Sequence, residues 1–217
     1  MKSETFLLAS LAALTQATAL PAHGCQTRGM VLTVQYLLVM CAYFVGSIPF
    51  GVLIARGLGV DIQSKGSGNI GATNVTRVLG PIPGAVVLVL DAAKGAAPTW
   101  FALTNVGDPW IVIACGAAAI LGHCFSPFLE FKGGKGVATA LGVFLVLCPD
   151  LVAISVIVFL VILKATRVPA LGSLAAVATI CGLLLARGDS SSATLALGTL
   201  MLLIYTHRTN LAKLAGR

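Results

Sequence analysis

A polar, glycine-rich segment between two apolar runs is the first place where residue types and spacing indicate chemistry. Residues 66–77 read Gly-Ser-Gly-Asn-Ile-Gly-Ala-Thr-Asn-Val-Thr-Arg. Glycines let the backbone bend sharply and bring its N–H groups close to an anion. Arg77 adds a planar guanidinium whose geometry suits phosphate oxygens. The other groups expected to contact the phosphate are Ser67, Gly68, Asn69, Thr73 and Asn74. The segment predicts a phosphate site, with a flexible polar linker as the alternative.

A second glycine-rich segment, residues 131–136, reads Phe-Lys-Gly-Gly-Lys-Gly and leads into an apolar run. A glycine-rich backbone followed by a helix N-terminus favours anions, because unpaired N–H groups and the helix dipole both attract negative charge. Lys132 and Lys135 add mobile positive charge, and Gly133 and Gly134 add backbone donors. The spacing is not that of a Walker A loop. The alternative is that the lysines only follow the orientation bias of membrane proteins.

Three more polar residues lie near the ends of later apolar runs. Ser173 is near the start of one run, and His207 and Asn210 follow the last. A His-x-x-Asn spacing on a helix points both side chains the same way. A histidine at such a position is able to accept a proton.

Ionisable residues also occur inside the apolar runs. Asp91 and Lys94 are three residues apart and therefore neighbours on one helical face, and His123 ends another run. Ionisable groups within a bilayer are costly, so they pair with each other or line a cavity. A structural ion pair and a role in positioning a substrate both remain open for these residues.

The apolar runs must position all of these groups. The 217 residues are 58% hydrophobic and 10% charged, with a mean hydropathy of +0.99. Such a chain has too few charges to cover a water-facing surface. We expect an all-α, polytopic transmembrane bundle of seven helices. The expected helices are 31–55, 82–104, 109–125, 136–148, 151–164, 170–187 and 193–206. The fourth and fifth are short, and a shallow hairpin is the alternative for them.

The distribution of charge predicts the orientation of this bundle. Most basic residues fall in one set of alternate connecting segments, and these are Arg56, Lys65, Arg77, Lys132, Lys135, Lys164, Arg167, Arg208, Lys213 and Arg217. Beyond residue 30 the opposite set holds Arg187. The positive-inside rule then places the N-terminal side outside and the C-terminus in the cytoplasm. The net charge of +7 does not indicate a nucleic-acid partner, because the basic residues sit singly between apolar runs.

The N-terminal segment and the cysteines carry no predicted chemistry. Residues 1–29 combine Lys2, a moderately apolar run and an A-x-A-like Ala-Thr-Ala string. They are interpreted as an extension outside the 30–217 membrane domain, either signal-like or an over-extended gene start. The six cysteines show no C-x-x-C spacing, which favours small buried hydrophobic residues over a metal site or a disulfide framework.

Several strings of this sequence together resemble one family. They are residues 46–51 (Gly-Ser-Ile-Pro-Phe-Gly), 66–77, 91–95 (Asp-x-x-Lys-Gly), 122–123 (Gly-His), 131–139 and 207–210 (His-Arg-x-Asn). From Met30 to the C-terminus the chain resembles the PlsY family, the integral-membrane acyl-phosphate:glycerol-3-phosphate acyltransferases of bacteria. The two glycine-rich strings are specific as a pair.

The resemblance implies a reaction at the inner (plasma) membrane. An acyl group moves from acyl phosphate to the 1-hydroxyl of sn-glycerol 3-phosphate, giving lysophosphatidic acid and inorganic phosphate for phospholipid synthesis. It implies no cofactor or metal, a seven-helix fold with a cytoplasmic active site, and contact with membrane lipid. A monomer is plausible, although the sequence leaves the oligomeric state open. The implied functional positions are Ser67, Arg77, Lys135, Ser173, His207 and Asn210.

The sequence departs from the family pattern at two places. Residues 168–173 read Val-Pro-Ala-Leu-Gly-Ser, where relatives usually have a Tyr-Val-Ser-Leu-x-Ser type string. Ala170 therefore lacks a hydroxyl, and Pro169 is expected to shift the start of that helix. Ser126 and Glu130 interrupt the usual Pro and Gly residues, and Glu130 adds negative charge beside an expected anion site.

Two other functions and one mechanistic choice remain open from the sequence. A phosphate-ester carrier would also need basic, glycine-rich loops, but the two halves show no repeat and the polar groups cluster at one face. A structural membrane protein leaves both loops unexplained. For the acyltransferase, His207 or a substrate phosphate would accept the proton of the attacking hydroxyl. No G-x-S-x-G elbow for an acyl-enzyme is present.

Overall fold

The computed structural model describes residues 23–216, which are helical and contain no strand, so the all-α prediction is confirmed over this range. Of the expected N-terminal extension 1–29, residues 1–22 lie outside the described residues, and residues 23–29 form the start of a helix. The chain divides into two units, residues 1–37 and 38–217. The elements are α2 (His23–Ser47), α3 (Phe50–Gly57), η1 (Ile62–Ser64), α4 (Ala72–Leu79), α5 (Pro81–Asn105), α6 (Pro109–Cys124), η2 (Pro127–Leu129), α7 (Val137–Leu147), α8 (Pro149–Thr166), α9 (Pro169–Arg187), α10 (Ser190–Thr206) and α11 (Arg208–Ala215).

The ends of the long helices follow from local sequence. Proline occupies the first turn of α5, α6, α8 and α9, where its missing N–H leaves no hydrogen bond unmade. The Asp108 carboxylate caps α6 by accepting the N–H groups of Trp110 and Ile111, and Asp189 caps α10 in the same way. These signals explain why the predicted bounds of α5, α6 and α9 are correct to within a few residues.

The sequence predicts one continuous helix over residues 31–55, and this is wrong because the structure divides that region into two helices. Helix α2 ends at Ser47 and α3 begins at Phe50, because Pro49 cannot donate to the preceding turn and its ring clashes there. The break frees the carbonyl oxygen of Ile48, which accepts a hydrogen bond from Lys94 Nζ at 2.7 Å. The string from 46 to 51 is therefore a helix interruption.

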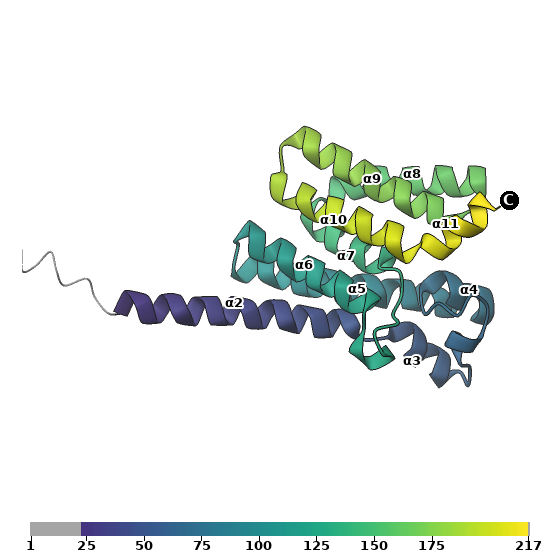
Figure 1. Ribbon diagram of the computed structural model, residues 1–217, viewed down its shortest axis with the longest axis horizontal. Helices are drawn as coiled ribbons and strands as arrows, with labels where there is room; N and C mark the ends of the chain where they lie inside the picture. Colours follow the sequence, from purple (N-terminus) through teal and green to yellow (C-terminus); the bar gives the residue numbers. More distant parts are fainter. Residues whose placement is uncertain (1–22, 217) are drawn as a thin grey trace, which may run out of the picture. The chain divides into compact units, whose positions relative to one another are not determined.

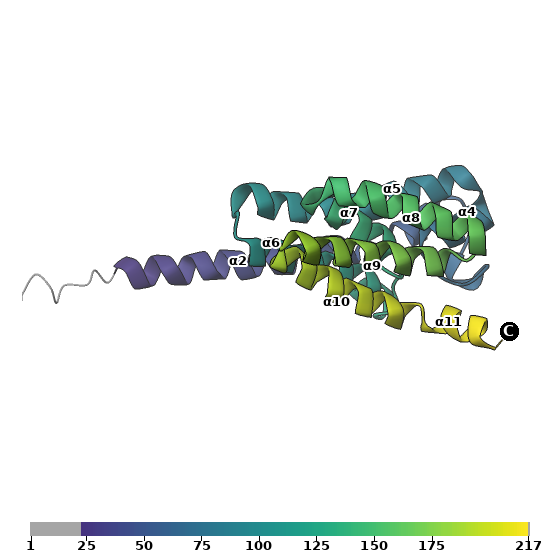
Figure 2. The same ribbon diagram turned by 90° about the horizontal axis from the view of Figure 1, so that it is seen from above.

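Two short helices lie outside the seven expected ones. Helix α4 follows the first glycine-rich segment and carries Arg77 in its last turn, and α11 carries Asn210 and Lys213. Neither contains an apolar run, so apolar patterning predicts polar connecting segments at both places. Figures 1 and 2 place α3, α4 and α11 at one end of the 38–217 unit, opposite the α5–α6 and α9–α10 connections.

The protein is a multi-pass membrane protein. Five helical segments are long and apolar enough to span a bilayer, and they are Leu32–Gly57, Pro109–Leu129, α5, α8 and α9. Helices α7 and α10 are shorter apolar helices. Helix α8 has 18 residues, longer than predicted, because it begins at Pro149 and ends at Thr166, whereas α7 has 11 residues, slightly fewer than predicted. The shallow-hairpin alternative therefore finds no support in the length of α8.

Close backbone contacts hold the first part of α7 against the middle of α5. A Cβ on Gly142 of α7 would collide with the backbone of Ala92, and one on Gly95 of α5 would collide with the carbonyl oxygen of Thr139. Small residues of this kind let membrane helices approach closely. Figure 1 shows α5 beside α7, while α9 packs between α8 and α10. The start of α7 is thus held firmly against α5.

Candidate active site

The first glycine-rich segment is organised around one buried side chain. Asn74 is 2% exposed, and its carboxamide oxygen accepts the Ser67 N–H at 2.9 Å. Its amide nitrogen donates to the carbonyl oxygens of Lys65 at 3.0 Å and Asn69 at 2.9 Å. We call residues 65–74 the glycine loop. Asn74 was predicted to contact phosphate, whereas in the structure its polar atoms hold this loop together.

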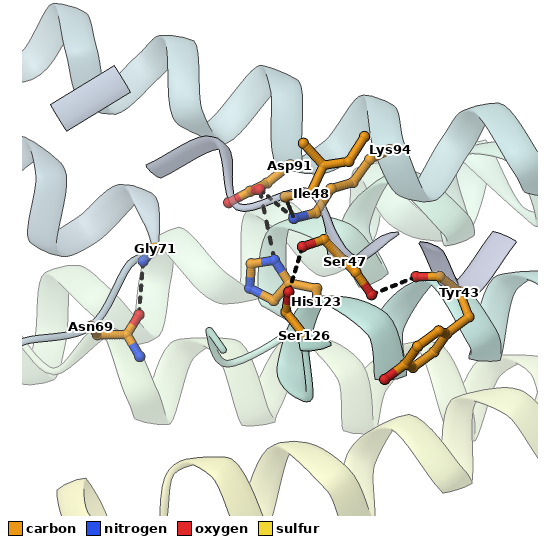
Figure 3. Close-up of polar contacts among 9 residues, drawn as sticks. All are labelled: Tyr43, Ser47, Ile48, Asn69, Gly71, Asp91, Lys94, His123 and Ser126. Atoms are coloured by element: carbon orange, nitrogen blue, oxygen red, sulfur yellow. Dashed lines mark hydrogen bonds and ion pairs between the residues drawn. The ribbon is translucent and has the colours of Figure 1, made fainter. Parts of the chain in front are cut away.

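The exposed side chains of this loop, and Arg77 just after it, are available to a ligand. The side chains of Ser67, Thr73 and Arg77 are exposed. Gly68 has φ +71°, a conformation that glycine adopts at little cost. The Asn69 carboxamide oxygen accepts the N–H of Gly71 at 2.8 Å (Figure 3) and so fixes the turn before α4. Ser67 and Thr73 therefore present hydroxyl groups, and Arg77, one helical turn after Thr73, presents a guanidinium.

The second segment, residues 131–136, is bound to the end of α6, and we call it the lysine loop. The Gly133 N–H donates to the Cys124 carbonyl oxygen and the Gly134 N–H to that of His123, both at 3.0 Å. These two N–H groups were expected to face phosphate, but here they are occupied within the protein. Gly136, with φ +86°, then starts α7 without a side-chain cap. The first N–H groups of α7 are the donors left for an anion.

Lys135 joins the lysine loop to the C-terminal segment. Its Nζ donates to the Asn210 carboxamide oxygen at 2.7 Å, and its carbonyl oxygen accepts the Thr206 hydroxyl at 3.1 Å. Burial lowers the pKa of Lys135 below its ordinary value, and the positive charges of Arg77 and Lys213 lower it further. Three cations from three segments therefore repel one another at this place, and a bound anion would relieve that repulsion.

His207 lies beside Lys135 with one ring nitrogen committed. The side chain is 3% exposed, and Nδ1 lies 2.9 Å from the Leu203 carbonyl oxygen. Because a carbonyl only accepts, this contact assigns the proton to Nδ1 and leaves the Nε2 lone pair free. Burial lowers the pKa of His207; the hydrogen bond to Leu203 partly opposes this and the Lys135 charge adds to it. A neutral imidazole of this kind is a competent base.

A buried polar cluster lies next to the lysine loop. Asp91, Lys94 and His123 are at most 3% exposed and lie together where α5 meets the end of α6 (Figure 3). Nearby, the Ser126 hydroxyl donates to the Ser47 carbonyl oxygen at 2.7 Å. The Tyr43 hydroxyl donates to the Phe125 carbonyl oxygen at 2.6 Å. These contacts anchor the chain between α6 and the lysine loop.

Comparison with known proteins identifies the family. The model of the family described as "Glycerol-3-phosphate acyltransferase" matches residues 36–217. The chain belongs to the glycerol-3-phosphate acyltransferase family.

Individual relatives agree with this assignment. The glycerol-3-phosphate acyltransferase of Myxococcus xanthus is 50% identical over 184 residues, covering 83% of this chain and 95% of the relative. That of Aquifex aeolicus is 42% identical over 179 residues, covering 82% and 93%. A crystal structure of PlsY (YgiH), an integral membrane glycerol 3-phosphate acyltransferase in its glycerol 3-phosphate form, has a TM-score of 0.82 and 41% identity. It covers 84% of this chain and 92% of that chain. The lysophosphatidic acid form has a TM-score of 0.80.

Two predicted site residues of the acyltransferase lie apart from the Lys135–Asn210 contact. Ser173 is buried in α9, where its hydroxyl donates to the Pro169 carbonyl oxygen at 2.9 Å. Lys132 is 80% exposed and pairs with Glu130 at 3.6 Å. Within residues 23–216 the structure records no hydrogen bond or ion pair of either with Lys135 or Asn210. Glu130 therefore pairs with Lys132 at the surface.

The structure also adds residues that the sequence did not assign to the site. Thr206 and Lys213 join the site through Lys135, and Ser126 joins through the anchored connection after α6. Lys213 lies three residues after Asn210, so the i, i+3 spacing was the available signal. The departure at Ala170 is structurally mild, because Pro169 begins α9 one residue before the predicted start and Ala170 is 3% exposed.

Proposed function

We propose that this acyltransferase uses acyl phosphate as its donor and makes lysophosphatidic acid and inorganic phosphate from sn-glycerol 3-phosphate. The observation that carries the proposal is the meeting of Lys135, Asn210 and the Arg77 charge beside the uncapped start of α7. Both substrates carry phosphate, so the site must offset repulsion between two anions before they can react. Two cations and a helix N-terminus supply that compensation without a metal or cofactor.

Each phosphate has a separate set of groups in this proposal. Glycerol 3-phosphate is bound by Arg77, Ser67 and Asn210, with the neutral donors of the glycine loop around it. The acyl phosphate head lies over the α7 N-terminus near Lys135 and the Ser173 side of α9, and its chain extends between helices into lipid. The internal hydrogen bonds of Asn74 support this division, because they hold Ser67 near Arg77.

The chemistry then needs one proton acceptor. The 1-hydroxyl oxygen attacks the acyl carbon, the bond from that carbon to the phosphate oxygen breaks, and the electron pair leaves with inorganic phosphate. The hydroxyl proton passes to His207 Nε2 or to a phosphate oxygen. Acyl phosphate is already an activated mixed anhydride, so no acyl-enzyme is required. The free Nε2 of His207 supports the histidine as acceptor.

The proposed setting is the bacterial inner membrane, crossed by seven helical segments, with the active site in the cytoplasm. The positive-inside rule supports this orientation, since Arg77, Lys135 and Lys213 belong to the cation-rich set of segments. Helices α7 and α10 would cross as shorter spans, tilted little and with locally thinned bilayer. Tagging the two termini and testing their accessibility in spheroplasts distinguishes this topology from its inverse.

One assay tests the reaction. Purified protein in detergent receives palmitoyl phosphate and radiolabelled glycerol 3-phosphate, with palmitoyl-CoA as the alternative donor in a parallel reaction. We expect labelled lysophosphatidic acid and one equivalent of inorganic phosphate from palmitoyl phosphate alone. Product from the thioester alone refutes the donor assignment. Uptake of label into proteoliposomes without product refutes the enzyme and supports a carrier.

A further inference from the structure

The buried cluster of Asp91, Lys94 and His123 has no part in the reaction as described. Lys94 Nζ lies 2.8 Å from Asp91 Oδ1, and His123 Nδ1 lies 3.7 Å from the same oxygen (Figure 3). Removing ionic groups from water is expensive, and within a membrane bundle such groups are retained where they serve a function. What the cluster contacts on each side therefore indicates its role.

On one side the cluster is fixed to rigid backbone. Lys94 Nζ donates to the Ile48 carbonyl oxygen at the break between α2 and α3. The ring of Phe50 lies 5.7 Å from the same ammonium group. Lys94 thus has little freedom to move, and Asp91 is held between it and the His123 ring. Asp91 Oδ1 therefore faces His123 Nδ1 at 3.7 Å, which is too far for a hydrogen bond but close enough for its charge to act on the ring.

On the other side the imidazole supports the lysine loop. The Gly134 N–H donates to the His123 carbonyl oxygen at 3.0 Å. A Cβ on Gly134 would collide with His123 Nε2 and would lie 2.7 Å from Cε1 and 3.0 Å from Cδ2. The three nearest atoms are all in this one ring, so the backbone of Gly134 lies directly against it. The next residue in the chain is Lys135.

We propose that His123 is a positioning residue. Its ring contacts the backbone of the lysine loop and thereby fixes where Lys135 and the start of α7 lie relative to the bound phosphate. Asp91 and Lys94 hold the ring in this orientation. The inference rests on the proposed function, because it assigns the supported loop to acyl phosphate. A displacement of about 1 Å in a substrate-positioning group costs up to ~10²-fold in rate, so a ring in direct contact with the loop backbone has a large effect on catalysis.

The contact between Gly134 and the His123 ring can be tested by introducing a steric clash at Gly134 and then removing it with a smaller side chain at position 123. Gly134→Ala alone should lower kcat/KM for palmitoyl phosphate by about 10²-fold, because the new methyl group pushes the loop off the ring. His123→Asn removes Nε2 and Cε1 but keeps a polar group near Asp91, and it should lower kcat/KM by about tenfold. In the His123→Asn background, Gly134→Ala should cost less than about threefold, so the double variant is more active than Gly134→Ala alone.

Gly133→Ala is the matched control. A Cβ there collides with the backbone carbonyl oxygens of His123 and Cys124, which no side-chain truncation removes. Gly133→Ala should therefore lower kcat/KM by a similar factor in the wild-type and His123→Asn backgrounds. If His123→Asn does not fold, His123→Ala takes its place, and recovery of each variant is judged by its Tm and by gel filtration in detergent.

The binding readout is competitive inhibition by inorganic phosphate. A displaced loop should raise the inhibition constant for phosphate by about tenfold in His123→Asn, while KM for glycerol 3-phosphate changes less than about threefold. Equal costs of Gly134→Ala in both backgrounds, or an unchanged phosphate inhibition constant, overturns the positioning role. A wild-type enzyme that makes no product from palmitoyl phosphate instead overturns the proposed function, so the two failures are distinguishable.

Discussion

Asn74 is the side chain whose removal tests most directly how the glycine loop is built. It is buried between α4 and η1, accepts one backbone N–H and donates to the carbonyl oxygens of Lys65 and Asn69. Asn74→Ala leaves those three backbone groups without their partner. A hydrogen bond contributes about 1 kcal/mol net, and a buried group left unsatisfied costs about 1–3 kcal/mol. Since part of the loop is open to water, we expect a local cost of about 2–4 kcal/mol.

Loss of the Asn74 side chain should reduce the local stability of the loop and the catalytic rate more than the global stability of the protein. If the loop must regain its order in the transition state, 2–4 kcal/mol corresponds to a loss of roughly 30-fold to 10³-fold in kcat/KM. Hydrogen exchange of residues 65–74 should accelerate correspondingly, while Tm falls only slightly because α5 to α10 are untouched. Asn105→Ala, at the end of α5, is the control and should keep wild-type activity. An Asn74→Ala enzyme within threefold of wild type, with unchanged exchange, refutes this account of the loop.

Three further predictions concern charge, protonation and packing. Arg77→Ala and Lys135→Ala should each lower kcat/KM by at least ~10²-fold, as loss of a charge-stabilising donor does, and steady-state kinetics near wild type in either variant removes that residue from the site. Because burial lowers the pKa of His207 below 6.5, kcat/KM should fall only as pH drops below 6.5, when the imidazole becomes protonated. His207→Ala should abolish this acidic limb, and a kcat close to wild type there favours a phosphate oxygen as the base. Gly142→Ala should lower Tm clearly, since its methyl group meets the α5 backbone, whereas Gly182→Ala, which faces open space, should not.

The long helices were predictable because their signals are local. Apolar composition, prolines at helix starts and aspartate caps all act within a few residues, so α5, α6 and α9 were located correctly. The break at Pro49 carried a local signal too, but the apolar run continues through it and conceals it. Helix α4 has few apolar residues, and its helical state depends on packing against α5.

The sequence predicted which residues belong to the candidate site better than it predicted which of them contact one another. The sequence identifies both Lys135 and Asn210, yet at a separation of 75 positions it gives no indication that they share a hydrogen bond. The role of Asn74 was also hidden, because an asparagine in a glycine-rich string is equally suited to bind a ligand or its own loop. Only the direction of its side chain distinguishes the two.

The amino-acid sequence alone determined that this protein is a membrane-embedded helical bundle with basic, glycine-rich connecting segments, since hydropathy, charge bias and backbone freedom are properties of residues and their neighbours. The tertiary structure decided which of those segments meet. It turned the N–H groups of Gly133 and Gly134 toward α6, placed the His123 ring under the lysine loop, and brought Lys135 to Asn210. These pairings follow from how whole helices pack, because close approach of α5, α6 and α7 is a property of their joint surfaces.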